Sequence, residues 1–457
     1  MRPIPYDLYA DRIQTASTIK QSGRVVQTIG LVVESIGPAV SIGDLCQIEN
    51  PDDGSRVKAE VVGFRDNRIL LMPLGTISGI TPGSIVVSTG EQLRIQVGEE
   101  LFGRVLGGLG QPIDGLGPLL TRHTRRIDSP PIPALKRTRI KDPVLTGIRA
   151  IDLMATCGKG QRMGIFAGSG VGKSVLLGMI ARGSSADVNV IALVGERGRE
   201  VREFIEKDLG TEGLKRSIVV AVTSDQPALI RIKGAMVATS IAEHFRDQGK
   251  NVMLLMDSIT RIAIGQREIG LAVGEPPATR GYTPSVFALL PRILERAGTN
   301  DKGSITGLYT VLVEGDDMNE PVSDSVRSIL DGHVALSRKL ASMNQYPAVD
   351  VLDSISRLMV DITTPEQQEL AARVREIVAT YREAEDLINI GAYVKGSSEK
   401  IDFAISKIDK INMFLRQEIK ESNDFEVSLR KLAEIIENNA ENSDEEVSVP
   451  AGKSAAA

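Results

Sequence analysis

The segment Ala167-Gly-Ser-Gly-Val-Gly-Lys-Ser174 limits what this chain can fold into more than any other feature of its sequence. An apolar run that predicts a strand precedes it, and an apolar run that predicts a helix, residues 174–181, follows it. A strand, a glycine-rich loop and a helix in this order form a P-loop, in which backbone N–H groups and the helix N-terminus surround a phosphate chain. Ala167 stands where the general pattern has glycine, so the match is to a relaxed form of the motif.

Each residue type of the loop suits one part of a bound nucleotide. The glycines let the backbone turn its N–H groups inward, Lys173 can reach the β- and γ-phosphates, and Ser174 can ligate Mg²⁺. We therefore expect ATP and Mg²⁺ as ligands; a chance glycine-rich turn is the alternative, which the flanking strand and helix disfavour. The predicted nucleotide-binding residues of the loop are Gly168, Ser169, Gly170, Val171, Gly172, Lys173, Ser174 and Val175.

Two further carboxylates follow apolar runs that predict buried strands. Asp257 ends the run 251–257 and is predicted to hold the metal with Ser174, the alternative being an ordinary N-cap of the next helix. Glu196 follows the run 188–194, at the sheet edge where ligands bind, and can polarise the attacking water. Arg197 beside it joins Lys173 and Glu196 among the candidate catalytic residues, whereas the charges from residue 199 to 203 predict a solvent-exposed, salt-bridged helix face.

Phosphoryl transfer also calls for an arginine, because one lysine and Mg²⁺ do not balance the charge on the γ-oxygens. Arg357 is the candidate, far from the P-loop in sequence and placed where a subunit border is plausible, although a surface arginine is the alternative. Tyr346 is a candidate for stacking on adenine, with a half-buried core tyrosine as the alternative.

The order of apolar runs predicts an α/β fold with three parts. Short β-rich runs at 25–33, 57–64 and 69–72 predict a small antiparallel barrel. Near-continuous apolar runs predict a mostly parallel sheet, and helical spacing follows at 366–390 and 398–438. The parallel runs are 162–166, 188–194, 218–222, 252–256 and 306–313.

The predicted boundaries follow from these runs and from the glycine- and proline-rich stretches between them. They are an N-terminal segment 1–22, a barrel domain 23–96, a linker 97–146, a P-loop ATPase domain 147–364, a helical domain 365–438 and a disordered tail 439–457.

The composition of the chain limits the classes of partner that it can bind. With 54 basic and 59 acidic residues the net charge is -5, and aromatic residues reach only 4%, which argues against a nucleic-acid partner. The basic cluster between residues 122 and 141 predicts a solvated linker rather than a nucleic-acid or lipid patch. Cys46 and Cys157 fit no metal spacing and predict reduced thiols, and no signal peptide is visible, so we expect a cytoplasmic protein.

Several motifs together resemble the F/V-type rotary ATPase superfamily: the P-loop, Gly195-Glu-Arg-Gly-Arg-Glu200, and Tyr346-Pro-Ala-Val-Asp350 through Ser354-Ile-Ser-Arg357. More narrowly, Glu275-Pro-Pro-Ala-Thr-Arg-Gly-Tyr282, Val313-Glu-Gly-Asp-Asp317 and Leu330-Asp-Gly-His333 are similar to the type III protein-export ATPases, where Ala167 is ordinary. The segment Ile388-Asn-Ile-Gly-Ala-Tyr393 with Lys400-Ile-Asp402 is most like the flagellar members.

The resemblance implies a RecA-like, F1-like core and an ATP hydrolase that energises flagellar protein export. It implies a homohexamer in which the P-loop of one subunit meets Arg357 of the next, and a pore loop around Arg280 to Tyr282. Implied partners are a regulator dimer docked on segment 1–22, a central coiled-coil stalk protein, export-gate membrane proteins, and export substrates with their chaperones. The implied location is peripheral, at the inner face of the cytoplasmic membrane.

Other classes of protein share the same core. The ATPase of a virulence secretion system and a catalytic subunit of a rotary ATPase remain alternatives. A non-catalytic rotary subunit is expected to lack a strand-end carboxylate such as Glu196. An RNA translocase calls for a basic, aromatic barrel, whereas residues 24–95 contain Phe64 as their only aromatic residue.

Overall fold

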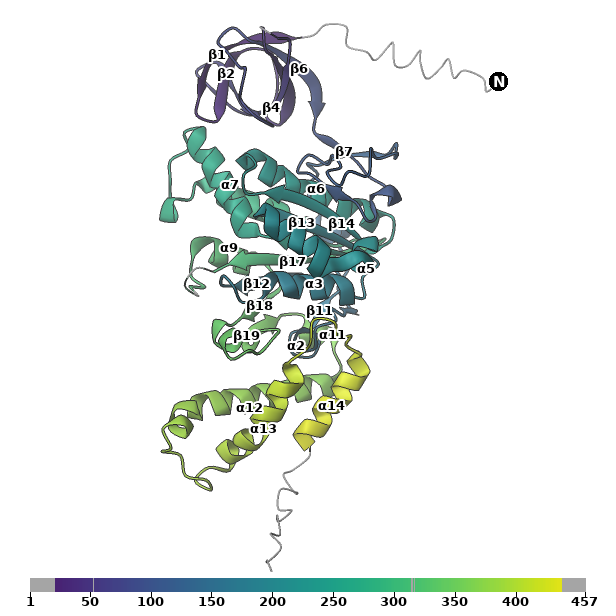
Figure 1. Cartoon of the computed structure of the whole chain (residues 1–457), viewed down its shortest axis with the longest axis vertical. Coiled ribbons are helices and arrows are strands. Elements are labelled where there is room, and N and C mark those ends of the chain that lie inside the picture. Colours follow the sequence, from purple (N-terminus) through teal and green to yellow (C-terminus); the bar gives the residue numbers. More distant parts are fainter. Residues whose placement is uncertain (1–20, 52, 314, 316, 438–457) are drawn as a thin grey trace, which may run out of the picture. The chain divides into compact units, whose positions relative to one another are not determined.

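The computed structural model describes residues 21–51, 53–313, 315 and 317–437 of the chain (Figure 1). Most of the predicted N-terminal segment 1–22, up to residue 20, and the predicted tail 439–457 lie outside these residues. The chain divides into two compact units. The barrel–sheet unit comprises Met1–Ile140, Lys159–Ser169 and Ala186–Asp331, and the helical unit comprises Lys141–Gly158, Gly170–Ser185 and Gly332–Ala457.

The barrel–sheet unit begins with a closed β-barrel of strand order β1-β2-β5-β4-β3-β6, as the sequence predicts (Figure 1). The predicted run 25–33 is two strands, because the chain turns back at Gly30, whose φ of +57° favours glycine. The strands are β1 (Ser22–Ile29), β2 (Val32–Ile36), β3 (Asp44–Glu49), β4 (Arg56–Arg65), β5 (Arg68–Pro73) and β6 (Ile85–Gln92).

A parallel sheet forms the rest of the core of this unit, and every predicted run becomes one of its strands. In spatial order they are β12 (Arg162–Ala167), β17 (Ser304–Leu312), β15 (Asn251–Asp257), β13 (Val188–Glu196), β14 (Ser217–Thr223) and β8 (Val105–Leu106). Neighbours in this order all pair in parallel. The short strand β16 (Gly298–Thr299) adds an antiparallel pairing to β17. The predicted α/β class is confirmed.

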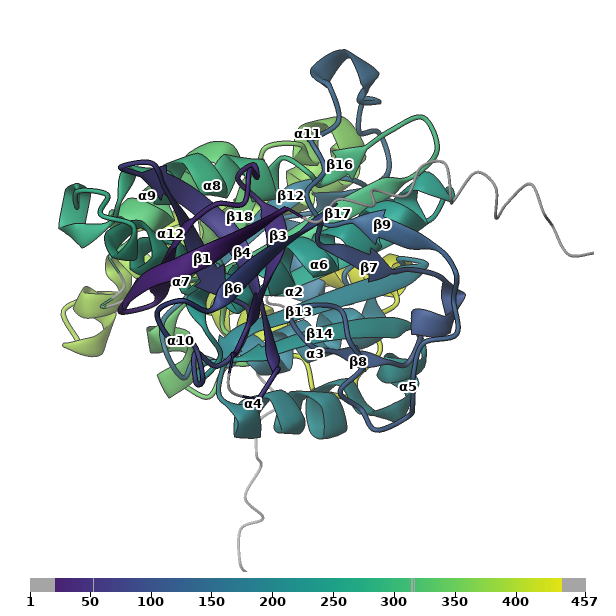
Figure 2. The same cartoon turned by 90° about the horizontal axis from the view of Figure 1, so that it is seen from above.

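Helices cover this sheet. Figure 2 shows α6 (Ala228–Asp247) against β13 and β14, and its buried face runs nearly its whole length. The other helices are α4 (Gly198–Glu203), a π-helical turn (Phe204–Leu209), α5 (Gly210–Lys215), α7 (Ile259–Ala272), α8 (Pro284–Leu294) and α9 (Pro321–Ile329).

The basic linker is less solvated than the sequence predicts. Arg125 of β9 (Thr124–Arg126), a strand paired with β7 (Arg94–Gln96), donates to Asp247 at 2.8 Å and to Glu243 at 3.2 Å. Arg137 binds the carboxylate of Glu295 at 3.0 Å. The two arginines therefore fasten the linker to α6 and to the end of α8, because acidic partners distant in sequence lie beside them.

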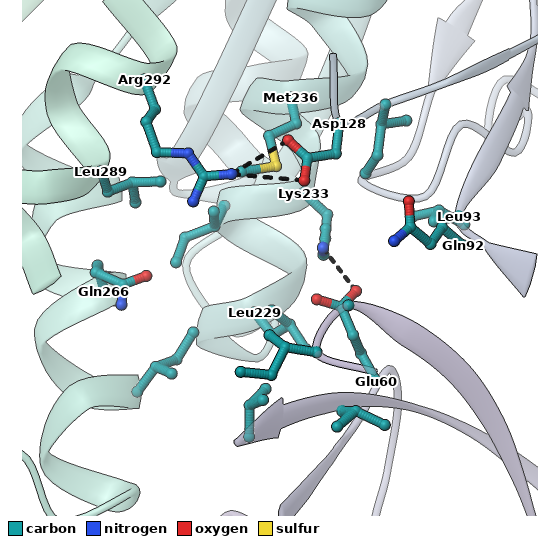
Figure 3. A pocket seen from close by; sticks show the side chains of 17 residues that line it. Glu60, Gln92, Leu93, Asp128, Leu229, Lys233, Met236, Gln266, Leu289 and Arg292 are labelled. Atoms are coloured by element: carbon teal, nitrogen blue, oxygen red, sulfur yellow. Dashed lines mark hydrogen bonds and ion pairs between the residues drawn. The ribbon is translucent and has the colours of Figure 1, made fainter. Parts of the chain in front are cut away.

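A buried ion pair joins the barrel to α6 (Figure 3). Nζ of Lys233 lies 2.6 Å from a carboxylate oxygen of Glu60 on β4, and both side chains are at least nine-tenths buried. The pair lines a cavity of about 230 Å³ whose walls are partly apolar and partly polar. Arg292 and Asp128 also line this cavity and lie 3.3 Å apart. Burial raises the pKa of Glu60, and the charge of Lys233 offsets only part of that effect.

The helical unit carries the P-loop helix and the C-terminal helices. Its strands form two antiparallel pairs, β10 (Pro143–Val144) with β11 (Cys157–Gly158) and β18 (Gly332–Leu336) with β19 (Val349–Ser356). Its helices are α2 (Arg149–Met154), α3 (Lys173–Gly183), α10 (Arg338–Ser342), α11 (Met359–Ile362), α12 (Pro365–Asn389), α13 (Glu399–Leu415) and α14 (Phe425–Glu437). In the described part of the chain, no helix combines the length and apolarity that a membrane crossing needs.

The single helix predicted at 398–438 is wrong, because the chain leaves the helix between α13 and α14. Buried Gln417 lies in this break, and its backbone N–H donates to the carbonyl of Tyr346 at 3.0 Å. Its side-chain amide donates to the carbonyl of Gly147 at 2.8 Å and accepts from the N–H of Arg149 at 2.9 Å. A residue inside a continuous helix would spend its backbone N–H on the helix itself.

Candidate nucleotide site

The carboxyl ends of three parallel strands bring predicted site residues to one edge of the sheet. β12 ends at Ala167, the first residue of the P-loop, and β15 ends at Asp257, which is level with Leu193 of β13. Glu196 ends β13. Because these strands are parallel, their ends share the edge at which open α/β sheets bind ligands.

The loop between β12 and α3 has the conformation that its glycines allow. Gly170 and Gly172 have φ values of +79° and +90°, a region that residues with a Cβ rarely adopt. Gly172 is the N-cap of α3 and offers its first turn no side-chain acceptor, an arrangement suited to N–H groups that bind an anion. Lys173 begins the helix and is half-buried, and Ser174 is exposed.

Tyr346 lies beside this loop within the helical unit. A Cβ added at Gly172 would lie 3.3 Å from Cε1 of the Tyr346 ring, so the ring touches the loop backbone. Tyr346 is 42% exposed, so part of its surface is open to solvent, and its role in stacking on a base stays a prediction. An aromatic face that is open to solvent next to a phosphate-binding loop can stack on a nucleotide base.

Asp257 is buried, with 2% of its surface exposed, and its carboxylate has a defined partner. The hydroxyl of Thr310 on β17 donates to Oδ1 of Asp257 at 2.7 Å. The N-cap of α7 is Ser258, whose side chain accepts from the N–H of Arg261, so Asp257 is not the ordinary cap that the alternative requires.

Glu196 is half-buried where the chain leaves β13. The preceding Gly195 has a φ of +74°, and a Cβ there would lie 2.9 Å from Cβ of Arg261, so only glycine fits between the strand end and α7. Glu200 reaches back to this position. Burial raises the pKa of Glu200, but hydrogen bonds with Glu196 and with Arg197 outweigh burial and hold that pKa below its usual value.

The remaining charges of this segment form the exposed ion pairs that the sequence predicts. Arg199 pairs with Glu203 at 2.9 Å and Arg202 with Glu206 at 2.8 Å, each one helical turn apart. Arg197 is exposed and pairs with Glu200 at 3.0 Å. In this structure the guanidinium of Arg197 therefore takes part in an ion pair within the first turn of α4.

Arg357 follows β19 in the helical unit and is exposed. Its side chain makes no hydrogen bond or ion pair with any residue in the described part of the chain. A long cationic side chain held at the end of a strand and left without an internal partner is suited to a partner in another molecule. The predicted site residues thus fall in both units, with Glu196, Arg197 and Asp257 in one and Lys173, Ser174, Tyr346 and Arg357 in the other.

Thr310 is the site residue that sequence reasoning missed. A threonine in the middle of a buried, otherwise largely apolar strand was the available signal, because a buried hydroxyl needs a partner. Its partner lies 53 residues away in sequence and becomes visible only in the sheet.

The fold and this sheet edge define the class of protein, a P-loop nucleotide-binding protein with an N-terminal barrel. The ATP synthase alpha/beta family matches in its nucleotide-binding domain at residues 147–356 and in its beta-barrel domain at residues 25–90. The T3SS EscN ATPase C-terminal domain matches residues 363–434.

Relatives narrow this class. The flagellum-specific ATP synthase of Bacillus subtilis (strain 168) is 57% identical over 94% of this chain and 98% of that protein. The type 3 secretion system ATPase of Xanthomonas euvesicatoria is 48% identical over 93% of this chain and 96% of that protein. The chain belongs to the ATP synthase alpha/beta family, in the branch of flagellum-specific and type 3 secretion ATPases.

A solved structure shows the same fold. The assembled ATPase EscN in complex with its central stalk EscO, from the enteropathogenic E. coli type III secretion system, superposes with a TM-score of 0.84. Sequence identity is 43%, and the match covers 91% of this chain and all of that chain.

Proposed function

We propose that this chain hydrolyses ATP and that the hydrolysis energises flagellar type III protein export. The observation that carries the proposal is the 57% identity to a flagellum-specific ATP synthase across nearly the whole chain. It is joined by strand β12, which leads into the P-loop and ends at the same sheet edge as the strands of Glu196 and Asp257. A P-loop binds the phosphates of a nucleotide, and strand-end carboxylates make such a loop part of a hydrolytic site.

The chain's own residues divide the chemistry between them. The N–H groups of residues 168–175 and the ammonium of Lys173 hold the phosphates, and Tyr346 stacks on the base. The carboxylate of Glu196 orients and polarises a water molecule for attack on the γ-phosphorus, with Arg197 beside it. Arg357 balances the charge that develops on the γ-oxygens.

Ser174 and Asp257 offer a hydroxyl and a carboxylate, the hard oxygen ligands that Mg²⁺ prefers, so the residues present suit this ion. When bound, Mg²⁺ supplies charge neutralisation on the phosphates. Asp257 would hold the ion through a buried carboxylate that accepts a hydrogen bond from Thr310.

The assembly is proposed to be a homohexamer in which each P-loop receives Arg357 from the neighbouring subunit. The exposure of Arg357 and its lack of a partner in the described part of the chain support this arrangement. A relative solved with its central stalk supports a central stalk partner, which we propose to be a coiled-coil protein. We include a regulator dimer at segment 1–22, export-gate membrane proteins, and substrates with chaperones as partners, and a position at the inner face of the cytoplasmic membrane.

The domain boundaries proposed are those predicted, with 23–96 as barrel, 97–146 as linker, 147–364 as ATPase domain and 365–438 as helical domain. The matched family segments, 25–90, 147–356 and 363–434, support them.

A virulence-secretion ATPase is the second candidate, favoured by the 48% identity to a type 3 secretion system ATPase. The higher identity to the flagellar protein and the segment 388–393 favour the flagellar role. A rotary catalytic subunit is disfavoured, because residues 363–434 match the C-terminal domain of a secretion ATPase.

Hydrolysis is tested with the purified full-length chain. We expect ATP turnover in Mg²⁺ and loss of nucleotide binding in Lys173→Ala, measured with a fluorescent ADP analogue. Turnover that persists unchanged in Lys173→Ala would show that the P-loop is not the site of hydrolysis.

A further inference from the structure

Thr310 occupies a central position in the sheet. Its strand, β17, lies between β12, which leads into the P-loop, and β15, which ends at Asp257. Thr310 is level with Ile165, two residues before the P-loop begins, and none of its surface is exposed. The residue is thus held between the two strands that deliver the loop and the carboxylate.

The hydroxyl of Thr310 has a direction fixed by chemistry. An ionised carboxylate only accepts hydrogen bonds, so the hydroxyl donates its single proton to Oδ1 of Asp257 at 2.7 Å. The carbonyl of Met256 lies farther away, at 3.4 Å. Hydrogen bonds from a hydroxyl to a charged acceptor are short and strong, and this one is protected from water.

Such a bond matters because a carboxylate on its own is poorly oriented. The χ2 torsion of aspartate is broad, so the direction of its oxygens depends on what surrounds them. Groups that hold a ligating side chain from behind commonly change metal affinity by about 10- to 100-fold when they are removed.

We infer that Thr310 is a positioning residue, whose hydroxyl orients the Asp257 carboxylate for the Mg²⁺ that accompanies the nucleotide. The inference rests on the proposed role of Asp257 in the metal site. Thr310 itself contacts neither nucleotide nor metal in this account, and it acts through the carboxylate.

The test is the Mg²⁺ dependence of nucleotide binding by the full-length protein, followed with a fluorescent ADP analogue while Mg²⁺ is titrated from an EDTA baseline. Thr310→Val keeps the β-branched shape of the side chain and removes the donor. We expect it to raise the Mg²⁺ concentration for half-maximal effect by about 10-fold. Thr310→Ser, which restores the donor, is expected to stay near the wild type, and Thr310→Ala provides a second deletion should the valine variant fold poorly.

Thr306→Val is the matched control. Thr306 lies on the same strand and is also buried, but its hydroxyl accepts from the N–H of Gly160 and does not serve Asp257. A shift in Thr310→Val without one in Thr306→Val supports the inference. Wild-type Mg²⁺ dependence in Thr310→Val, or equal shifts in both valine variants, overturns it.

The variant Asp257→Asn distinguishes a failure of the proposed metal role of Asp257 from a failure of the positioning role of Thr310. If Asp257→Asn shifts the Mg²⁺ dependence while Thr310→Val does not, the inference fails and the proposed metal role of Asp257 stands. If Asp257→Asn also binds nucleotide with wild-type Mg²⁺ dependence, both fail.

Discussion

Asp257 and Glu196 both end parallel strands, yet their surroundings give them different capabilities. Asp257 is buried and its carboxylate is fixed by Thr310. Glu196 is only half-buried, and Glu200 forms a hydrogen bond with it. A fixed carboxylate suits the binding of an ion, and a half-buried one suits the orientation of a water molecule.

We predict that Glu196→Gln binds nucleotide like the wild type and loses turnover by on the order of 10²-fold or more, because the amide cannot accept a proton. Steady-state ATP hydrolysis measured beside analogue binding tests this.

Glu203→Gln provides the control, since Glu203 carries the same charge on an exposed ion pair with Arg199. It is expected to keep wild-type turnover. Hydrolysis that survives in Glu196→Gln would exclude Glu196 as the essential base.

The sequence predicts a site residue where the residues next to it in the chain form a recognisable pattern. Lys173 follows a run of glycines, and Asp257 and Glu196 each follow an apolar run, so their positions at a sheet edge could be predicted. Thr310 could not, because its role depends on the pairing of β17 beside β15. The contact of Tyr346 with Gly172 likewise depends on the fold, although the motif around Tyr346 suggested it.

Among the helices and strands, the spacing of apolar residues predicted the strands of the sheet. It did not predict the break between α13 and α14, where tertiary contacts end the helix. The apolar spacing continues past residue 415, yet the helix ends there, because Gln417 forms hydrogen bonds with Tyr346, Gly147 and Arg149. The prediction of a solvated linker fails for the same reason. Arg125 and Arg137 pair with acidic residues that are distant in sequence and that only the fold brings beside them.

The barrel and α6 give a prediction at this scale. The substitution Lys233→Met leaves the buried Glu60 carboxylate without its cation. Removal of one member of a buried ion pair lowers the free energy of unfolding by about 3–5 kcal/mol. We expect a lower Tm in thermal unfolding at neutral pH, and a partial recovery in the double variant Glu60→Gln, Lys233→Met, which has no buried charge at this place.

The pH dependence of that loss follows from the pKa of Glu60, which burial raises. A carboxyl whose pKa is raised on folding is less costly below that pKa and more costly as pH rises through it. The Tm difference between Lys233→Met and the wild type is therefore expected to be smaller near pH 5 than near pH 7.5. A difference that does not change with pH would contradict the burial of an ionised Glu60.

In the proposed hexamer, catalysis by each molecule depends on assembly with its neighbours. Arg357 is exposed and has no internal partner in the described part of the chain, so its proposed target is the P-loop of a neighbouring subunit. An arginine that acts in this way contributes about 10³-fold or more to turnover.

We predict that Arg357→Ala is inactive alone and regains activity when mixed with Lys173→Ala subunits, which supply an intact arginine. ATP hydrolysis across mixing ratios, with oligomer size checked by light scattering, measures this. Arg338→Ala, at an exposed arginine of the same unit, is the control and should be active alone. Mixed oligomers that form and stay inactive would show that Arg357 does not act between subunits.

ATP hydrolysis by this chain is proposed to energise flagellar export. This proposal is tested most directly in a deletion strain complemented with the wild type or with Glu196→Gln and scored for flagellar filaments, virulence secretion and ATP synthesis. We expect the deletion to remove filaments alone, and we expect the wild type, but not Glu196→Gln, to restore them. Normal filaments in the deletion strain, or loss of ATP synthesis or virulence secretion instead, would contradict it.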